Sequence, residues 1–166
     1  MFVGEPAGAS DEEYLDDGYL AIPPNFRAYL GGIPGVSRGH PEARLVDAYV
    51  RWMQRPDHFS HRYLPSEGLF TDLFDRAYWR LLEAKADCER RTLRTAVGQL
   101  YDYKRYFARR PSLGVLLPER PSNACMNYLR DCRVVVVWRT PAGRFSDSTE
   151  DKRWTKRPST TVQGKK

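Results

Sequence analysis

The 166-residue chain has few of the features that mark disulfide frameworks, zinc cages and membrane spans. It holds three cysteines, an odd number without a CxxC pair, and so indicates neither a disulfide framework nor a cysteine-based zinc site. No apolar run approaches the roughly 20 residues that cross a bilayer. The first residues lack the basic and apolar regions of a secretory signal. These absences predict a cytoplasmic protein without a membrane partner.

Basic residues are missing from the first 21 positions, which carry six carboxylates, whereas residues 139–166 hold eight basic and three acidic residues. The net charge is +6. A basic surplus favours polyanionic partners through counterion release, but a lysine-rich terminus is equally typical of a solvated tail. Charge alone therefore does not identify the partner.

The length predicts one domain with an ordinary core. Residues 1–39 are rich in glycine, proline and acidic groups, which predicts an acidic N-terminal arm outside the folded domain. Residues 40–140 carry the helical and strand patterns of the folded domain. Residues 141–166 are polar and basic, which predicts a largely disordered tail.

Helical spacing of apolar residues predicts one helix from Pro41 to just before Pro56 and a second from Arg91 to about Arg109. A third helix is predicted over residues 121–132, with Ser122 as its N-cap. Strand patterns occupy HFSHRYLP, LFTDLF, WRLLEAKA, SLGVLLP and RVVVVWR. Tight turns make the early strands antiparallel, and helical crossovers make the later ones parallel. The fold class predicted is a mixed α/β (α+β) sheet flanked by helices.

The stretch LFTDLFDRAYWRLLEAKAD places two acidic groups and a lysine in an otherwise apolar hairpin. If Asp75 and Tyr78 close the turn, Asp72 lies opposite Leu81 and on the same face as the two polar residues of the second strand. The three side chains that then converge are those of Asp72, Glu83 and Lys85.

Paired carboxylates supply the hard oxygen ligands that Mg²⁺ prefers, and a metal cancels their repulsion. Asp72 and Glu83 would hold the metal, with the Ala84 carbonyl as a third ligand. Lys85 would orient or deprotonate a water aimed at a phosphodiester and stabilise the developing negative charge. This arrangement predicts metal-dependent phosphodiester hydrolysis.

The hairpin resembles the D…(D/E)xK signature of the PD-(D/E)xK, or restriction-endonuclease-like, nuclease superfamily. In addition, GQLYDY is similar to the Q-hydrophobic-x-x-Tyr motif of its RecB-like branch, with Gln99 and Tyr103 in the two fixed places. The resemblance covers about Pro41 to Thr140. Thr71 precedes Asp72, where the name of the motif has proline.

This resemblance implies an αβββαβαβ core, dependence on Mg²⁺ or Mn²⁺, and DNA as the usual substrate. It implies catalytic roles for the residues that match the two motifs, namely Asp72, Glu83, Lys85, Gln99 and Tyr103. Glu42 matches the additional acid that many members carry on the first helix, although it also suits the positive end of a helix dipole. A one-domain enzyme that cuts both strands would act as a homodimer.

Basic residues flank the second predicted helix. Arg91 and Arg94 at its start, and Lys104 and Arg105 near its end, are candidate contacts to nucleic-acid phosphates; a solvated helix face is the alternative for each. Helix-turn-helix and zinc-finger patterns are missing, so sequence-specific base recognition is not predicted.

Two other interpretations remain open at this stage. One is a catalytically silent module of the nuclease fold that binds nucleic acid or a protein partner. The other is an unrelated α/β scaffold in which Glu83 and Lys85 form an exposed ion pair worth about 0 to 1 kcal/mol.

Overall fold

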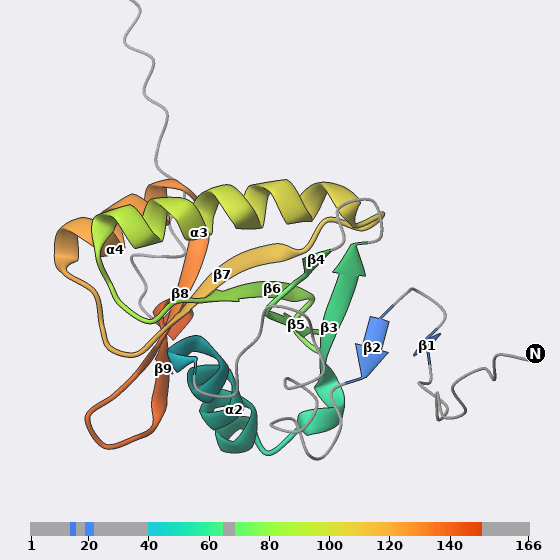
Figure 1. Ribbon diagram of the computed structural model, residues 1–166. Coiled ribbons are helices and arrows are strands. Elements are labelled where there is room, and N and C mark those ends of the chain that lie inside the picture. Colours follow the sequence, from blue (N-terminus) through green and yellow to red (C-terminus); the bar gives the residue numbers. More distant parts are fainter. Residues whose placement is uncertain (1–13, 16–18, 22–39, 65–68, 151–166) are drawn as a thin grey trace, which may run out of the picture.

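The structure, a computed structural model, describes residues 14–15, 19–21, 40–64 and 69–150 (Figure 1). Its strands are β1 (Tyr14–Leu15), β2 (Tyr19–Ala21), β3 (Phe59–Leu64), β4 (Leu69–Phe70), β5 (Leu73–Asp75), β6 (Arg80–Ala84), β7 (Ser112–Leu117), β8 (Val134–Arg139) and β9 (Phe145–Asp147). The helices are α2 (Pro41–Met53), α3 (Arg90–Tyr103) and α4 (Asn123–Asp131), with short 3-10 turns η1 (Pro56–His58), η2 (Lys104–Tyr106) and η3 (Ser148–Glu150).

The strands form one sheet in the order β1-β2-β3-β5-β6-β7-β8-β9, and β4 also pairs with β3. Strands β3, β5 and β6 are antiparallel neighbours, whereas β6, β7 and β8 run parallel because α3 and α4 connect them. The predicted mixed sheet flanked by helices is confirmed. None of the helices that the structure describes is long and apolar enough to span a bilayer.

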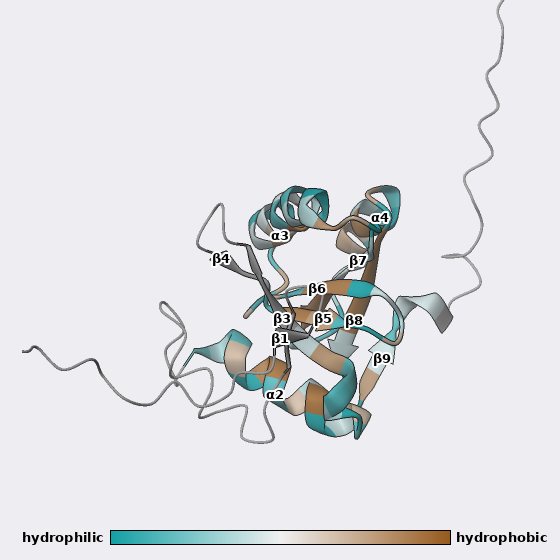
Figure 2. Ribbon diagram, turned by 90° about the vertical axis from the view of Figure 1, so that its right-hand side faces the viewer, coloured by the Kyte–Doolittle hydropathy of each residue, from teal (hydrophilic) through white to brown (hydrophobic). Residues whose placement is uncertain are grey.

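Helices cover both faces of the sheet: α3 and α4 lie on one face, and α2 lies on the other (Figure 1). Side chains alternate along each strand, so Leu81 of β6 packs in the α3/α4 layer, while Leu82 and Ala84 pack in the α2 layer. Figure 2 shows hydrophobic strand segments between the helical layers and hydrophilic residues along the outer side of α3. Two apolar layers therefore hold the sheet in place.

The helix boundaries follow local chemistry. Pro41 occupies the first turn of α2, and Gln54 ends the helix with a left-handed φ of 54°. The Ser122 hydroxyl accepts a hydrogen bond from the backbone N–H of Cys125 at 3.3 Å, as expected of an N-cap. Helix α3 ends at Tyr103 and passes into η2, so it is shorter than predicted.

The stretch LFTDLF is not one strand. Thr71 and Asp72 separate β4, which pairs with β3, from β5, which pairs with β6. Leu81 lies opposite Phe74, so the prediction that it faces Asp72 is wrong by two residues. The turn is longer than expected because Asp75 pairs with Arg80 rather than closing against Tyr78. A shift of two leaves every side chain on its predicted face, because side chains alternate with a period of two.

The Asp75 side chain shapes this turn. Its carboxylate accepts hydrogen bonds from the backbone N–H groups of Ala77, at 2.9 Å, and Tyr78, at 3.2 Å. This is the turn role that the sequence predicts for Asp75.

The sheet continues beyond Thr140, where the folded domain was expected to end. Arg139 pairs with Phe145 across a turn that includes Gly143 at a φ of 77°. The Phe145 ring is buried against Tyr49 of α2, with ring centroids 5.1 Å apart. The prediction of a disordered tail is therefore wrong for residues 141–150, because the buried Phe145 side chain holds this otherwise polar segment on the sheet. Residues 151–166 lie outside the described residues.

At the other edge of the sheet, β2 pairs with β3, so residues 19–21 of the predicted acidic arm join the sheet. The remainder of the prediction for residues 1–39, apart from the short strand β1, lies outside the described residues.

Candidate active site

Three predicted site residues meet where β6 ends. Asp72 lies in the bend before β5, and its Oδ2 accepts a hydrogen bond from the backbone N–H of Ala84 at 2.9 Å. Glu83, near the end of β6, is only 3% exposed, and its carboxyl is hydrogen-bonded to that of Asp72. The Lys85 Nζ donates to Glu83 Oε1 at 2.8 Å. The structure thus brings Asp72, Glu83 and Lys85 together.

The carboxyl pair is strongly perturbed. Burial raises the pKa of Glu83 to about 8, and the charge of Asp72 adds to this rise while Lys85 opposes it. Burial likewise raises the pKa of Asp72, against the lowering effect of the Ala84 N–H. A hydrogen bond between two carboxyls requires a proton on one of them. Near neutral pH the pair therefore retains one proton and carries one negative charge.

Lys85 balances this charge as an ammonium. Burial by itself lowers the Lys85 pKa, but Glu83, Asp72 and Glu42 together outweigh that effect, and the pKa is raised. A lysine with a raised pKa remains protonated near neutral pH and donates hydrogen bonds. In this state it can orient a water or an anionic oxygen, whereas it cannot accept a proton.

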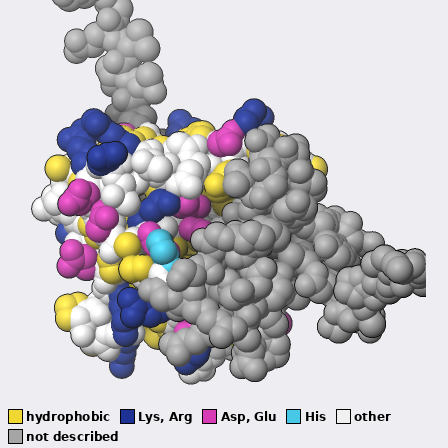
Figure 3. All heavy atoms as spheres, viewed as in Figure 1, with side chains coloured by type: hydrophobic (Ala, Val, Ile, Leu, Met, Phe, Trp, Pro, Cys, Tyr) yellow, Lys and Arg dark blue, Asp and Glu magenta, His cyan; other side chains and the backbone are white. Residues whose placement is uncertain are grey.

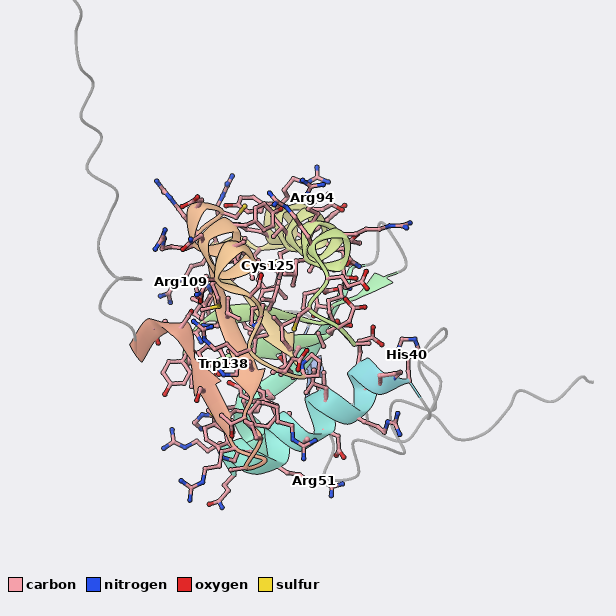
Figure 4. The ribbon with its side chains drawn as sticks, turned by 90° about the vertical axis from the view of Figure 1, so that its left-hand side faces the viewer. His40, Arg51, Arg94, Arg109, Cys125 and Trp138 are labelled. Atoms are coloured by element: carbon pink, nitrogen blue, oxygen red, sulfur yellow. The ribbon has the colours of Figure 1, made fainter. Side chains whose placement is uncertain are left out.

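The first turn of α2 contributes another acid. Glu42 is half-buried, and its charge raises the pKa values of both Asp72 and Lys85, which places it beside the carboxyl pair. Its Oε2 contacts Nδ1 of His40, the residue that precedes the helix. Figure 4 shows His40 at the start of α2. The structure therefore brings Glu42 near Asp72 and Lys85, and its role as an additional acid stays a prediction.

Helix α3 presents Gln99 and Tyr103 toward the same site. The Gln99 Nε2 donates to the Tyr103 hydroxyl at 3.5 Å, as the i, i+4 spacing predicts. Burial raises the pKa of Tyr103, and Glu83 adds to the rise, which places the phenol near that carboxyl. Tyr103 is therefore a neutral phenol near neutral pH, with a proton to donate.

The four predicted phosphate-binding residues fall into two groups. Arg91 and Arg94 are exposed in the first half of α3, and Figure 4 shows Arg94 pointing away from the helical layer. Arg105 instead pairs with Asp102, and Lys104 lies 5.5 Å from the centroid of the Tyr101 ring. In Figure 3, Lys and Arg side chains gather at the end of the molecule where α4 and the start of α3 lie. Arg91, Arg94 and Arg105 are all exposed, but Arg105 is already paired with a carboxylate.

The donor set fits a hard divalent cation. Two adjacent carboxyls supply the hard oxygen ligands that such a cation prefers, and Mg²⁺ is commonly held by one or two carboxylates with waters and phosphate oxygens. Among the described residues, no group of three or more His, Cys, Asp or Glu side chains is arranged to hold a metal. The Ala84 group that contacts Asp72 is its backbone N–H, whereas the predicted third ligand is the carbonyl of the same residue.

Sequence reasoning missed two features. His40 contacts Glu42 at the edge of the site, and its position just before the helix-starting Pro41 was the available signal. The second feature is the ion pair between Arg80 of β6 and Asp147 of β9. No sequence signal pointed to this pair, because Asp147 lies in the segment interpreted as a tail.

Comparisons of the chain with protein-family models, with curated proteins and with solved structures found no match.

Proposed function

We propose that the chain is a metal-dependent nuclease that hydrolyses phosphodiester bonds of DNA. The observation that carries this proposal is the buried Asp72–Glu83 carboxyl pair with Lys85 at hydrogen-bond distance from Glu83. Support also comes from the element order, in which α2, β3, β5, β6, α3, β7, α4 and β8 follow the restriction-endonuclease-like αβββαβαβ core when the short β4 is set aside. The exposed ion pair considered as an alternative is unsupported, because Glu83 is buried.

Asp72 and Glu83 would hold Mg²⁺ or Mn²⁺. A bound divalent cation supplies Lewis-acid polarisation of a phosphoryl oxygen and lowers the pKa of water. The carboxyl pair must lose its shared proton for this role, so cation binding and proton release are coupled.

The other side chains have roles that follow from their protonation states. Lys85, an ammonium, orients the attacking water and stabilises the negative charge that develops on the phosphate. Tyr103 remains a neutral phenol that donates a hydrogen bond near Glu83, and Gln99 positions its hydroxyl. Glu42 adds negative charge beside the pair and favours a bound cation.

Nucleic acid would approach along the first half of α3. Arg91 and Arg94 contact phosphates, which positions the backbone without reading sequence. Each lost phosphate contact should reduce the slope of log affinity against log salt by about 1. Replacing Arg94 with alanine should therefore weaken binding and flatten the salt dependence, whereas replacing Arg105, which Asp102 already pairs, should change both less.

A cleavage assay tests the proposal directly. Supercoiled, linear and single-stranded DNA are incubated with Mg²⁺, Mn²⁺ or EDTA, using the intact protein and the variants Asp72→Asn and Lys85→Ala. We expect metal-dependent cleavage that falls by about 10²- to 10³-fold in both variants, the usual cost of removing one such group. Asp131→Asn is the matched control, because its side chain on α4 is 75% exposed.

Thermal melting checks that each variant folds. Salt-dependent DNA binding without cleavage in either metal would overturn the hydrolytic proposal and favour the catalytically silent module. Cleavage that survives both Asp72→Asn and Lys85→Ala would place the chemistry elsewhere.

A further inference from the structure

A cavity of about 210 Å³ lies between the end of α2, the β5–β6 turn and β9. Its walls include Tyr49, Trp52, Tyr78, Arg80, Phe145 and Asp147. Arg80 shares the α2 face of the sheet with Leu82, since both approach Gly114 from the same side. Glu83 points to the other face and lies three residues along β6, about 10 Å at the usual rise of a strand. The cavity is therefore separate from the candidate active site.

Aromatic side chains give the cavity flat apolar walls at its mouth. Trp52 is 43% exposed and Tyr78 is 58% exposed, whereas most large apolar side chains of the described chain are buried. The inner side of Trp52 is supported by Tyr49, at 6.3 Å between ring centroids, and by Phe145, at 5.7 Å. A wall held in this way can stack on a planar ligand with little loss of side-chain entropy.

The floor of the cavity carries a fixed ion pair. Arg80 Nη1 donates to Asp147 Oδ2 at 2.6 Å, and Asp147 Oδ1 accepts from the backbone N–H of Thr149 at 2.6 Å. The Arg80 guanidinium also lies 5.6 Å from the centroid of the Tyr78 ring. Carboxylate oxygens accept more than one hydrogen bond, so Asp147 retains acceptor capacity. The buried Arg80 Nε has no hydrogen-bond partner in the described part of the chain.

The size of the cavity limits what it can hold. It exceeds the roughly 150 Å³ that takes up a benzene molecule and falls below the roughly 300 to 1,000 Å³ of sites for drug-sized ligands. The occupant is therefore a single ring system rather than a dinucleotide cofactor or a folded peptide. Among planar ring systems, nucleobases combine a face for stacking with an edge of donors and acceptors, and arginine is the usual partner of the guanine acceptors.

We propose that the cavity binds one unpaired purine base, with the ring stacked at Trp52 and Tyr78 and its polar edge at Arg80 and Asp147. The base can come from a free nucleotide or from a single strand of nucleic acid, and the chemistry of recognition is the same. Base stacking on aromatic side chains contributes enough for each base to be measured by substitution. The site requires no metal and no cleavage.

Nuclear magnetic resonance of the indole N–H groups tests this proposal in EDTA. GMP and AMP should shift the Trp52 indole signal in a saturable way, and ribose 5-phosphate should bind at least tenfold more weakly. Trp79 is the internal reference, because its indole N–H is bonded to the Arg109 carbonyl at 3.0 Å, outside the cavity walls. Tyr78→Leu should weaken GMP binding at least fivefold. Tyr101→Leu, which removes another exposed tyrosine, should leave it unchanged.

A single-stranded oligonucleotide with one guanine distinguishes the two sources. Tighter binding than GMP identifies a base within a strand, whereas equal or weaker binding identifies a free nucleotide. Equal shifts with ribose 5-phosphate, equal losses in the two tyrosine variants, or a Trp52 shift with N-acetyl-argininamide but not with nucleotides would overturn the proposal. Because the titration excludes metal, its failure leaves the cleavage assay unaffected, and a failed cleavage assay does not affect the titration.

Discussion

Replacing Glu83 by glutamine should change how the stability of the metal-free protein depends on pH. The folded carboxyl holds its proton up to about pH 8, whereas an unfolded glutamate loses it near 4.5. Between these values the folded state binds more protons than the unfolded state, so stability falls as pH rises. The glutamine variant keeps the shape of the side chain and cannot titrate.

The magnitude follows from the size of the pKa rise. The full rise corresponds to about 5 kcal/mol at most, lost as pH rises through the window from 4.5 to 8. About 2 to 3 kcal/mol of this falls between pH 6 and pH 8.5, which is about 5 to 10 °C in melting temperature for a chain of this size. Lys85 does not contribute in this window, because its pKa is raised from an already alkaline value.

Thermal melting in EDTA across pH 6 to 8.5 measures the effect. The intact protein should lose about 5 to 10 °C more than Glu83→Gln, and Asp131→Asn should behave like the intact protein. Mg²⁺ should raise the melting temperature of the intact protein more at pH 8.5 than at pH 6, because the cation competes with the shared proton. If the melting temperatures of the intact protein and of Glu83→Gln fell equally between pH 6 and pH 8.5, the argument that burial keeps this carboxyl protonated would be refuted.

Two further predictions concern the scaffold. Ser122→Ala removes the acceptor for the Cys125 N–H and should lower the free energy of unfolding by about 1 kcal/mol in urea, whereas Ser122→Asp should restore it; equal stability of all three proteins would contradict the capping role. Gly114→Ala would place a Cβ 2.7 Å from Cδ2 of the fully buried Leu82 and should cost roughly 1 to 3 kcal/mol, since the packed core must shift. The double variant Gly114→Ala with Leu82→Val should lose less free energy of unfolding than the sum of the losses in the two single variants. If Gly114→Ala were as stable as the original protein, the core would accommodate the added methyl group without a cost, which contradicts this prediction.

The helix starts, and the order of the elements from Pro41 to Arg139 apart from the split of LFTDLF into β4 and β5, were predictable because they depend on local chemistry. Pro41 and Ser122 mark helix starts through backbone geometry and a single hydrogen bond, both of which act within one turn. The convergence of Asp72, Glu83 and Lys85 was predicted from strand alternation. The predicted register was wrong by two residues, and a shift by an even number of residues leaves each side chain on the same face of the sheet. The register itself depended on the length of the turn after Asp75.

Features that depend on distant contacts were not predictable. The segment after Thr140 looks like a tail in composition, but Phe145 docks on Tyr49, and Ser148 accepts a hydrogen bond from the Val136 N–H at 2.9 Å. The proximity of Tyr103 to Glu83 depends on how α3 crosses the sheet. These contacts join segments that are far apart in the sequence, so the local pattern of the residues concerned does not encode them.

The sequence by itself determined which residue types alternate, where helices start, and which charged groups share a face, because these follow from the fixed periods of helix and strand. Only the tertiary structure decided that Glu83 is buried enough to keep a proton near neutral pH, and that Arg80 and Asp147 meet at a cavity. Burial and pairing between distant segments arise when layers pack, and the electrostatic consequences of packing depend on every neighbour at once.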